Sequence, residues 1–217
     1  MTNPATLLSI HVGPIAPLGP DGVASGFVKS RVEGPVAVGL LGLEGDEQAD
    51  LAVHGGPEKA VYAYPAAHYR DWGLEYPQHS DKFVAGGVGE NLTIDGWTEA
   101  DVCVGDIHSI GSALFQACQP RQPCFKFALR FDDNLLPKAM VRNGRAGWYY
   151  RVIEEGVIRA GDPALLAERP NPGFGFERLV EIVNRGGASR AELEAMARMT
   201  GLASRMQARA RAALDQV

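Results

Sequence analysis

Short apolar segments separated by glycine- and proline-rich turns run from residue 6 to residue 163, and they constrain the fold most strongly. Their apolar residues alternate or form short runs, as expected of strands rather than helices. The segments are 6–12, 26–32, 34–43, 61–64, 92–94, two strands within 99–110, 112–118, 147–153 and 157–159. Helices are predicted only near 65–72 and 135–142, and Pro163 is expected to end this part. Many short strands with few helices predict an antiparallel barrel or sandwich, so the fold class is mainly β with some α.

The hydrophobic period changes after residues 169–173, whose proline, asparagine and glycine content is typical of a linker. Beyond it, helical patterns cover 176–184, 189–199 with Ser189 as N-cap, and about 204–214. The chain is therefore divided into a β domain, residues 1–168, and a small C-terminal three-helix bundle, residues 169–217. The bundle could mimic a helix-turn-helix, but arginines on one helix face usually lie in solvent, which favours packing over DNA reading.

The composition excludes several classes of protein. A net charge of −5, with 22% charged and 46% hydrophobic residues, fits a soluble globular chain without a basic field for nucleic acid or membrane. Residues 1–8 show neither a signal peptide nor a membrane span. The three cysteines lack the spacing of a disulfide framework or a zinc site, and Cys103 and Cys118 lie in apolar runs typical of a core. A reducing cytoplasm is the expected location.

The third cysteine, Cys124, stands in a different setting. Pro120 and Pro123 restrict the backbone, so the chain is expected to leave a strand and hold Cys124 in a stiff, extended turn. Arg121 and Lys126 flank the thiol, and nearby cations favour the thiolate, the form that attacks or binds soft metals. The alternative is a small buried apolar cysteine, which is the commoner fate of this residue.

Two glycine-rich stretches could let the backbone approach a ligand closely. In residues 53–60, His54 precedes Gly-Gly-Pro and could donate to an anion, relay a proton or bind a metal, or it could cap a tight turn. Residues 86–91 end in a carboxylate and the amide of Asn91, which could hold a polar ligand edge or form an ordinary turn. Neither stretch has the strand–loop–helix context of a dinucleotide-binding loop.

Charged residues elsewhere have two interpretations each. Lys29 and Arg31 lie on a weakly alternating segment and are either a solvated strand face or anion anchors at a cavity mouth. Asp46 and Asp50 are expected to be turn residues, because their spacing does not follow a calcium-binding loop. As charged side chains on strands or loops, Lys29 and Arg121 are expected to act on ligand affinity and to contribute little to stability, under about 1 kcal/mol.

Taken together, residues 45–50, 53–60, 89–92, 119–124 and 147–149 resemble the MOSC domain, and the resemblance covers nearly the whole chain. This domain is shared with the C-terminal part of molybdenum cofactor sulfurases, and the chain resembles its bacterial YiiM type most. The resemblance implies a closed, antiparallel β-barrel followed by a three-helix extension. It also implies a homodimer.

The implied ligand is the molybdenum cofactor, with Cys124 as the thiolate that binds molybdenum. Members of this type are implied to reduce N-hydroxylated compounds such as hydroxylamino-purines with electrons from a flavin reductase, without pyridoxal phosphate. Cys124 and His54 are the implied catalytic residues. The candidate cofactor-binding residues are Lys29, Ser30, Arg31, His54, Lys59, Asn91 and Arg121. The family often has threonine where Ser30 stands, so the match of this basic loop is only approximate.

Three other functions suit the same residues. The protein could be a sulfur-transfer protein that carries a persulfide on Cys124, a non-enzymatic carrier of the cofactor, or a regulatory module that binds a partner through its helices. The chain also lacks the clustered cysteines of an iron–sulfur protein. A molybdenum centre here would have no built-in electron relay, so electrons are expected from a second protein.

Overall fold

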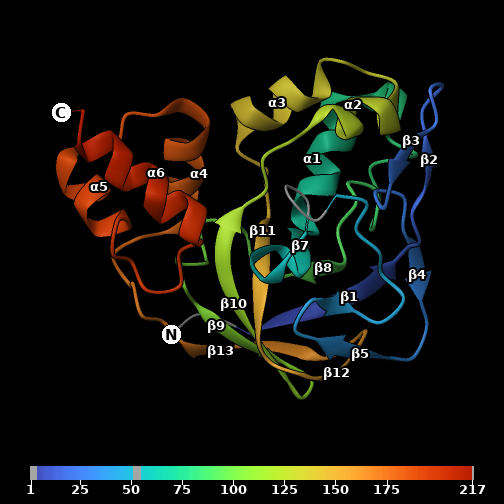
Figure 1. Cartoon of the computed structure of the whole chain (residues 1–217). Helices are drawn as coiled ribbons and strands as arrows, with labels where there is room; N and C mark the ends of the chain where they lie inside the picture. Colours follow the sequence, from blue (N-terminus) through green and yellow to red (C-terminus); the bar gives the residue numbers. More distant parts are fainter. Residues whose placement is uncertain (1–3, 51–54, 217) are drawn as a thin grey trace.

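The computed structural model describes residues 4–50 and 55–216. Within these ranges seven strands close into a barrel in the order β13-β9-β10-β11-β7-β8-β1, and β13 pairs with β1 to complete the ring (Figure 1). Their bounds are β1 Ala5–Val12, β7 Val61–Pro65, β8 Leu92–Asp95, β9 Ile107–Ile110, β10 Ala113–Pro120, β11 Trp148–Glu154 and β13 Pro163–Glu168. A closed, mainly β barrel is thus confirmed.

The barrel is mixed rather than antiparallel, which corrects the expected strand directions. β7 and β8 run parallel, with Ala63 opposite Leu92. Parallel neighbours need a crossover connection, and this one contains α1 (Ala67–Glu75) and the short 3₁₀ helix η2 (Pro77–His79). The sequence indicated a helix after β7, but it did not indicate that the chain crosses over before β8.

Three segments differ from the pattern-based expectation. The first strand expected within 99–110 is absent, because residues 99–104 form turns apart from one isolated bridge between Cys103 and Gly175. Within 26–32 only β4 (Ser30–Val32) is a strand, and it pairs with β1. Pro163 opens β13 instead of ending the barrel. Proline is tolerated there because the first residue of a strand can lack the ladder N–H.

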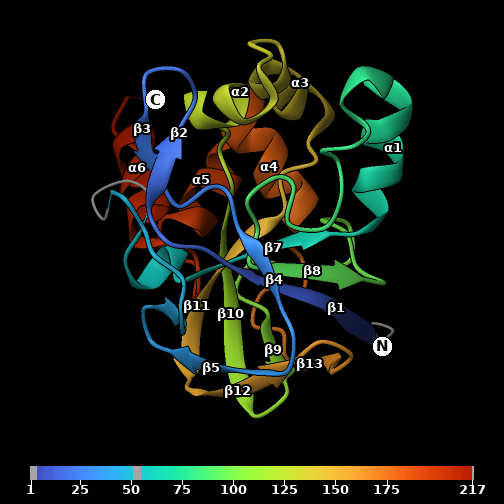
Figure 2. The same cartoon turned by 90° about the vertical axis from the view of Figure 1, so that its right-hand side faces the viewer.

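Two smaller sheets accompany the barrel. The bend predicted within residues 34–43 separates β5 (Pro35–Gly39) from β6 (Gly42–Leu43), and β12 (Gly156–Arg159) pairs with β5. β2 (Ala16–Leu18) and β3 (Val23–Ser25) form a hairpin that stands above the barrel near α2 (Phe125–Phe131), as Figure 2 shows.

The C-terminal helices α4 (Phe176–Arg185), α5 (Arg190–Met196) and α6 (Ser204–Leu214) lie together against one side of the barrel (Figure 1). Ser189 caps α5 as predicted, in a reciprocal capping box with Glu192. However, α4 packs on β10, and the buried side chains of all three helices belong to the same hydrophobic cluster as the barrel interior. The helices therefore share the core of the barrel and do not form a bundle with a core of its own.

A second, aromatic cluster joins α1, α2 and α3 (Leu136–Asn143) above the barrel. Trp72 stacks on Phe83 with ring centroids 5.0 Å apart, and Phe127 and Phe131 pack edge to face at 5.1 Å. This cluster fixes α2, whose first residue follows Cys124, against the barrel. In the part of the chain that the structure describes, no helix combines the length and apolar character needed to cross a membrane.

Candidate functional site

A pocket opens where the end of β10 meets the loop before β4, and its empty volume is about 640 Å³ with the solvent at its mouth included. Its lining brings together five residues predicted from the sequence: Lys29, Lys59, Asn91, Arg121 and Cys124. These residues come from four separate stretches of the chain. The pocket therefore exists only in the folded protein.

Two other predicted residues, Ser30 and Arg31, do not join this lining in the structure. Ser30 and Arg31 are exposed, and the Arg31 Nε lies 3.0 Å from Glu33 Oε1 at the surface. β4 begins only at Ser30, so Lys29 precedes the strand and does not share a strand face with Arg31. The prediction for His54 falls outside the described residues.

Cys124 lies between β10 and α2 in extended backbone, with φ −116° and ψ 175°. The stiff, extended turn predicted from the prolines is thus present. Cys124 is partly exposed, whereas Cys103 and Cys118 are buried as predicted. Burial raises the pKa of Cys103 and raises that of Cys118 to about 12, so both remain neutral thiols. Among the three cysteines, Cys124 is the one placed to meet a ligand.

Arg121 is a buried cation held by aromatic rings. Its guanidinium carbon lies 5.1, 5.0 and 5.5 Å from the ring centroids of Phe27, Tyr62 and Phe127. Nη1 donates to the carbonyl oxygen of Val88 at 2.5 Å. Within residues 4–50 and 55–216, no carboxylate forms an ion pair with it. A buried charge of this kind favours an anion in the adjoining pocket.

The positive charge of Arg121 interacts with several groups that line the pocket. Burial by itself would lower its pKa, but the nearby Tyr62, Tyr149 and Cys124 more than offset this, and its pKa lies above the usual value. Conversely, a fixed positive charge such as that of Arg121 favours the thiolate form of a neighbouring cysteine. Lys59 adds a second cation, and its Nζ lies 5.6 Å from the ring centroid of Tyr149. It also interacts electrostatically with Cys124. The thiol of Cys124 thus lies in an electropositive, partly open setting.

Lys29 is buried in an ion pair with Asp46, whereas the expectation that it contributes little to stability assumes a solvent-exposed side chain. Their side chains are 6% and 3% exposed. The Asp46 carboxylate also accepts from Gly13 N at 3.0 Å and from Asn91 Nδ2 at 2.9 Å. Asn91 Oδ1 in turn accepts from Tyr62 N at 3.0 Å. Asn91 therefore lines the pocket with its amide already engaged by the protein.

Asp46 and Glu90 have structural roles that the sequence did not indicate, because Asp46 was expected only to be a turn residue and the Glu90 carboxylate only to hold a ligand edge or form a turn. Glu90 is fully buried, and one of its oxygens accepts from Tyr69 Oη, from Gly86 N at 2.6 Å and from Thr93 Oγ1 at 2.9 Å. Burial raises its pKa, although these donors oppose the shift. The sequence showed only a carboxylate beside a glycine-rich turn. Its role in anchoring that turn behind the pocket depends on side chains from α1 and β8.

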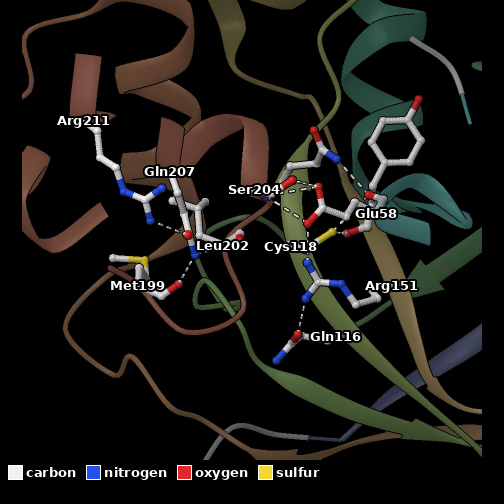
Figure 3. Close-up of polar contacts among 11 residues, drawn as sticks. Glu58, Gln116, Cys118, Arg151, Met199, Leu202, Ser204, Gln207 and Arg211 are labelled. Carbon is white, nitrogen blue, oxygen red and sulfur yellow. Dashed lines mark hydrogen bonds and ion pairs between the residues drawn. The ribbon is translucent and has the colours of Figure 1, made fainter. Parts of the chain in front are cut away.

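The C-terminal helices reach the site through Glu58, which lies in the short 3₁₀ helix η1 (Pro57–Lys59). Its carboxylate accepts from Ser204 N at 2.9 Å and from Ser204 Oγ at 2.9 Å, at the first residue of α6 (Figure 3). Arg151 Nη2 donates to the same carboxylate at 2.6 Å, and its Nη1 donates to Gln116 at 2.6 Å. The contact fixes the start of α6 beside the residues that surround Cys124.

We expect the Glu58→Gln variant to lose roughly 1 kcal/mol of unfolding free energy at neutral pH, because a charged acceptor becomes a neutral one. Burial would raise the pKa of Glu58, but Ser204 and Arg151 hold it below its usual 4.5. A carboxyl with a lowered folded pKa stabilises the protein above its unfolded pKa, and this contribution disappears as pH falls through the folded pKa. In urea unfolding, the difference in unfolding free energy between the parent protein and Glu58→Gln should shrink as the pH is lowered from about 7 to about 3. A difference independent of pH would contradict this role.

Residues 50–164 match the family described as MOSC domain, and the chain belongs to this family. Protein YiiM of Escherichia coli strain K12 is 45% identical over 150 residues, covering 69% of this chain and 67% of that protein. A protein of Gibberella moniliformis named "Reductase" is 37% identical over 190 residues, which are 86% of this chain but only 34% of the fungal protein. The crystal structure of YiiM from Geobacillus stearothermophilus matches with a TM-score of 0.81 and 35% identity, covering 97% of this chain and 99% of that one.

Proposed function

We propose that this MOSC-domain protein is a molybdenum-cofactor-dependent reductase of N-hydroxylated compounds. The observation that carries the proposal is the partly exposed Cys124 at the edge of one pocket, beside the buried Arg121, which forms no ion pair with a carboxylate of the described residues. The fungal relative named "Reductase" supports the reaction type. Its similarity covers only about a third of its length, so its activity is extended to this chain as part of the proposal.

The residues present fit the cofactor. A cysteine thiolate is a soft ligand, and soft ligands suit metal–sulfur chemistry. Arginine and lysine suit the phosphate and polar edges of a pterin, and a buried cation without a carboxylate has its charge available for an anion. We assign Cys124 to the metal, and Arg121 and Lys59 to the anionic part of the cofactor. The charge of Lys29 is already neutralised by Asp46, so its contribution is to hold the pocket wall.

Reduction of an N-hydroxylated amine converts R–NHOH, two electrons and two protons into R–NH₂ and water. When bound, the molybdenum cofactor supplies the two-electron chemistry. The chain contributes the thiolate at Cys124 and the positive charge that favours the thiolate. Proton delivery is proposed for His54, whose ordinary pKa lies near neutrality.

Purified, cofactor-loaded protein is expected to show no turnover of a hydroxylamino-purine with NADPH alone. The chain has no dinucleotide loop and no clustered cysteines, so we propose that electrons arrive from a separate flavin reductase. Adding such a reductase, or a reduced viologen dye, should start turnover. Chromatography of substrate and amine product measures it.

Robust turnover with NADPH and no second protein would contradict the proposed electron input. No turnover with either donor, in protein with stoichiometric molybdenum cofactor, would favour a cofactor carrier instead. The matched blank is the Cys124→Ala protein prepared in the same way.

A further inference from the structure

Tyr149 lies on the outer face of β11, at the border between two hollows beside Cys124. Its neighbours Trp148 and Tyr150 are completely buried, and side chains alternate along a strand, so Tyr149 points away from the barrel interior. It lines the pocket described above and a second hollow on the side of α6, whose empty volume is about 580 Å³ with open solvent included. Cys124 lines both spaces as well. The phenol and the thiol therefore face the same space from different elements.

The ring of Tyr149 is held in place by its neighbours in the sheet. Tyr149 lies opposite Tyr62 of β7, and their ring centroids are 5.1 Å apart. Arg121 and Cys124 are both close enough to affect the pKa of Tyr149, because burial raises this pKa most, Arg121 lowers it and Cys124 raises it. The phenol thus has a fixed position near both the cation and the thiol of the site.

The hydroxyl of Tyr149 differs from those of the other five tyrosines. Each of the five takes part in a hydrogen bond with another group of the protein; they are Tyr62, Tyr64, Tyr69, Tyr76 and Tyr150. Within residues 4–50 and 55–216 the side chain of Tyr149 forms no hydrogen bond, and Cys118 donates only to its backbone carbonyl oxygen. Polar groups in the interior of a protein nearly always find a partner. A phenol without one, at the border of a hollow, favours a ligand that accepts a hydrogen bond there.

We propose that Tyr149 is a catalytic proton donor, whose hydroxyl binds the nitrogen-bound oxygen of the substrate and protonates it as the N–O bond breaks. The reaction itself rests on the proposed function. Two electrons from the flavin reductase cleave the N–O bond of R–NHOH. The proton of Tyr149 goes to the leaving oxygen, which departs as water, and the nitrogen takes the second proton, for which His54 is assigned above. The phenolate left behind is stabilised by the positive charge of Arg121 and regains its proton from solvent.

The first measurement is the binding of N-hydroxyadenine, a hydroxylamino-purine, and of adenine to oxidised, cofactor-loaded protein by calorimetry. No reductant is present, so no turnover occurs. Tyr149→Phe removes the hydroxyl and keeps the ring, and it is expected to weaken N-hydroxyadenine about 5- to 10-fold and leave adenine unchanged, because adenine lacks the accepting oxygen. Equal affinities of the parent protein and Tyr149→Phe for N-hydroxyadenine would overturn the contact.

The second measurement is turnover of N-hydroxyadenine with reduced viologen dye. In Tyr149→Phe, kcat should fall at least about 100-fold, since a positioned proton donor contributes about 100- to 10,000-fold. Cofactor content after gel filtration should stay at the parent level. The urea unfolding midpoint should also stay unchanged, because no hydrogen bond within the described residues is lost. Loss of the cofactor from Tyr149→Phe would overturn the substrate contact in favour of a role in holding the cofactor.

Tyr150→Phe is the matched control, because it removes the hydroxyl of the next residue on the same strand. That hydroxyl is buried and lies 2.6 Å from His108 Nδ1. The control should therefore lower the urea midpoint and keep kcat, the opposite of Tyr149→Phe. An unchanged kcat in Tyr149→Phe, with a parent protein that turns over, would overturn the role of Tyr149 alone. A parent protein that neither binds nor reduces N-hydroxyadenine would remove the proposed function and, with it, the substrate contact.

Discussion

Replacing Cys124 by alanine is expected to remove both bound molybdenum and reductase activity, to below about 1% of the parent protein. Changes to groups that merely surround a metal ligand already cost about 10- to 100-fold, and the loss of the ligand itself should cost more. Cys124 is partly exposed and is not part of either hydrophobic core cluster. The variant should therefore fold normally. Metal analysis of the purified protein and turnover with reduced viologen dye measure the two effects.

Cys103→Ala and Cys118→Ala are the matched controls. Both residues are buried, and Cys118 donates to the carbonyl oxygens of Glu58 and Tyr149 at 3.1 and 3.4 Å. Their loss should lower stability modestly while molybdenum content and turnover remain. Full molybdenum occupancy in Cys124→Ala would rule out the ligand assignment. A persulfide on Cys124 in metal-free protein, detected by mass spectrometry, would instead favour sulfur transfer.

The Asp46→Ala variant is expected to lose roughly 3–5 kcal/mol of unfolding free energy, because it leaves the buried Lys29 cation without its partner. Both side chains are almost fully shielded from solvent, at 6% and 3% exposure. The Asp46 carboxylate also serves Gly13 N and the amide of Asn91, so its removal loosens the pocket wall as well. Urea unfolding at neutral pH gives the free energy.

Asp46→Asn removes the charge and keeps one oxygen that can still accept from Gly13 N, but its NH₂ group then faces Asn91 Nδ2, so that hydrogen bond is lost as well. The Asp46→Asn variant should therefore still show a large part of the loss of unfolding free energy expected for Asp46→Ala. The control is Glu194→Ala, because Glu194 pairs with Arg190 on the surface of α5 with side chains 45% and 62% exposed. Surface pairs contribute about 0–1 kcal/mol. If Asp46→Ala lowers the unfolding free energy no more than Glu194→Ala does, the ion pair between Lys29 and Asp46 does not stabilise the fold.

The features that sequence reasoning predicted are those that depend on neighbours in the chain. Alternation places β1, β10 and β11, and the prolines around Cys124 predict its extended backbone. The capping box at Ser189 is likewise local, since its partner is three residues away.

The features that it missed depend on residues distant in sequence. The burial of Arg121 requires rings from three separate segments, and the burial of Lys29 requires a carboxylate 17 residues away. The direction of β8 depends on the path of the chain after α1, which no periodicity encodes. β13 was missed because a proline at its start looks like a strand terminator, although it is tolerated at that position.

The pairing of β13 with β1 also determines the order of folding events. Ala5 lies opposite Ala164, so the ring cannot close until almost the entire barrel sequence is available. Contacts between such distant residues slow folding, because a long loop loses its entropy before the pairing stabilises it. Until then β1 and β9 present open strand edges, which are sites of misassembly between chains. The yield of the closed barrel is therefore expected to depend on how long these edges stay open during folding.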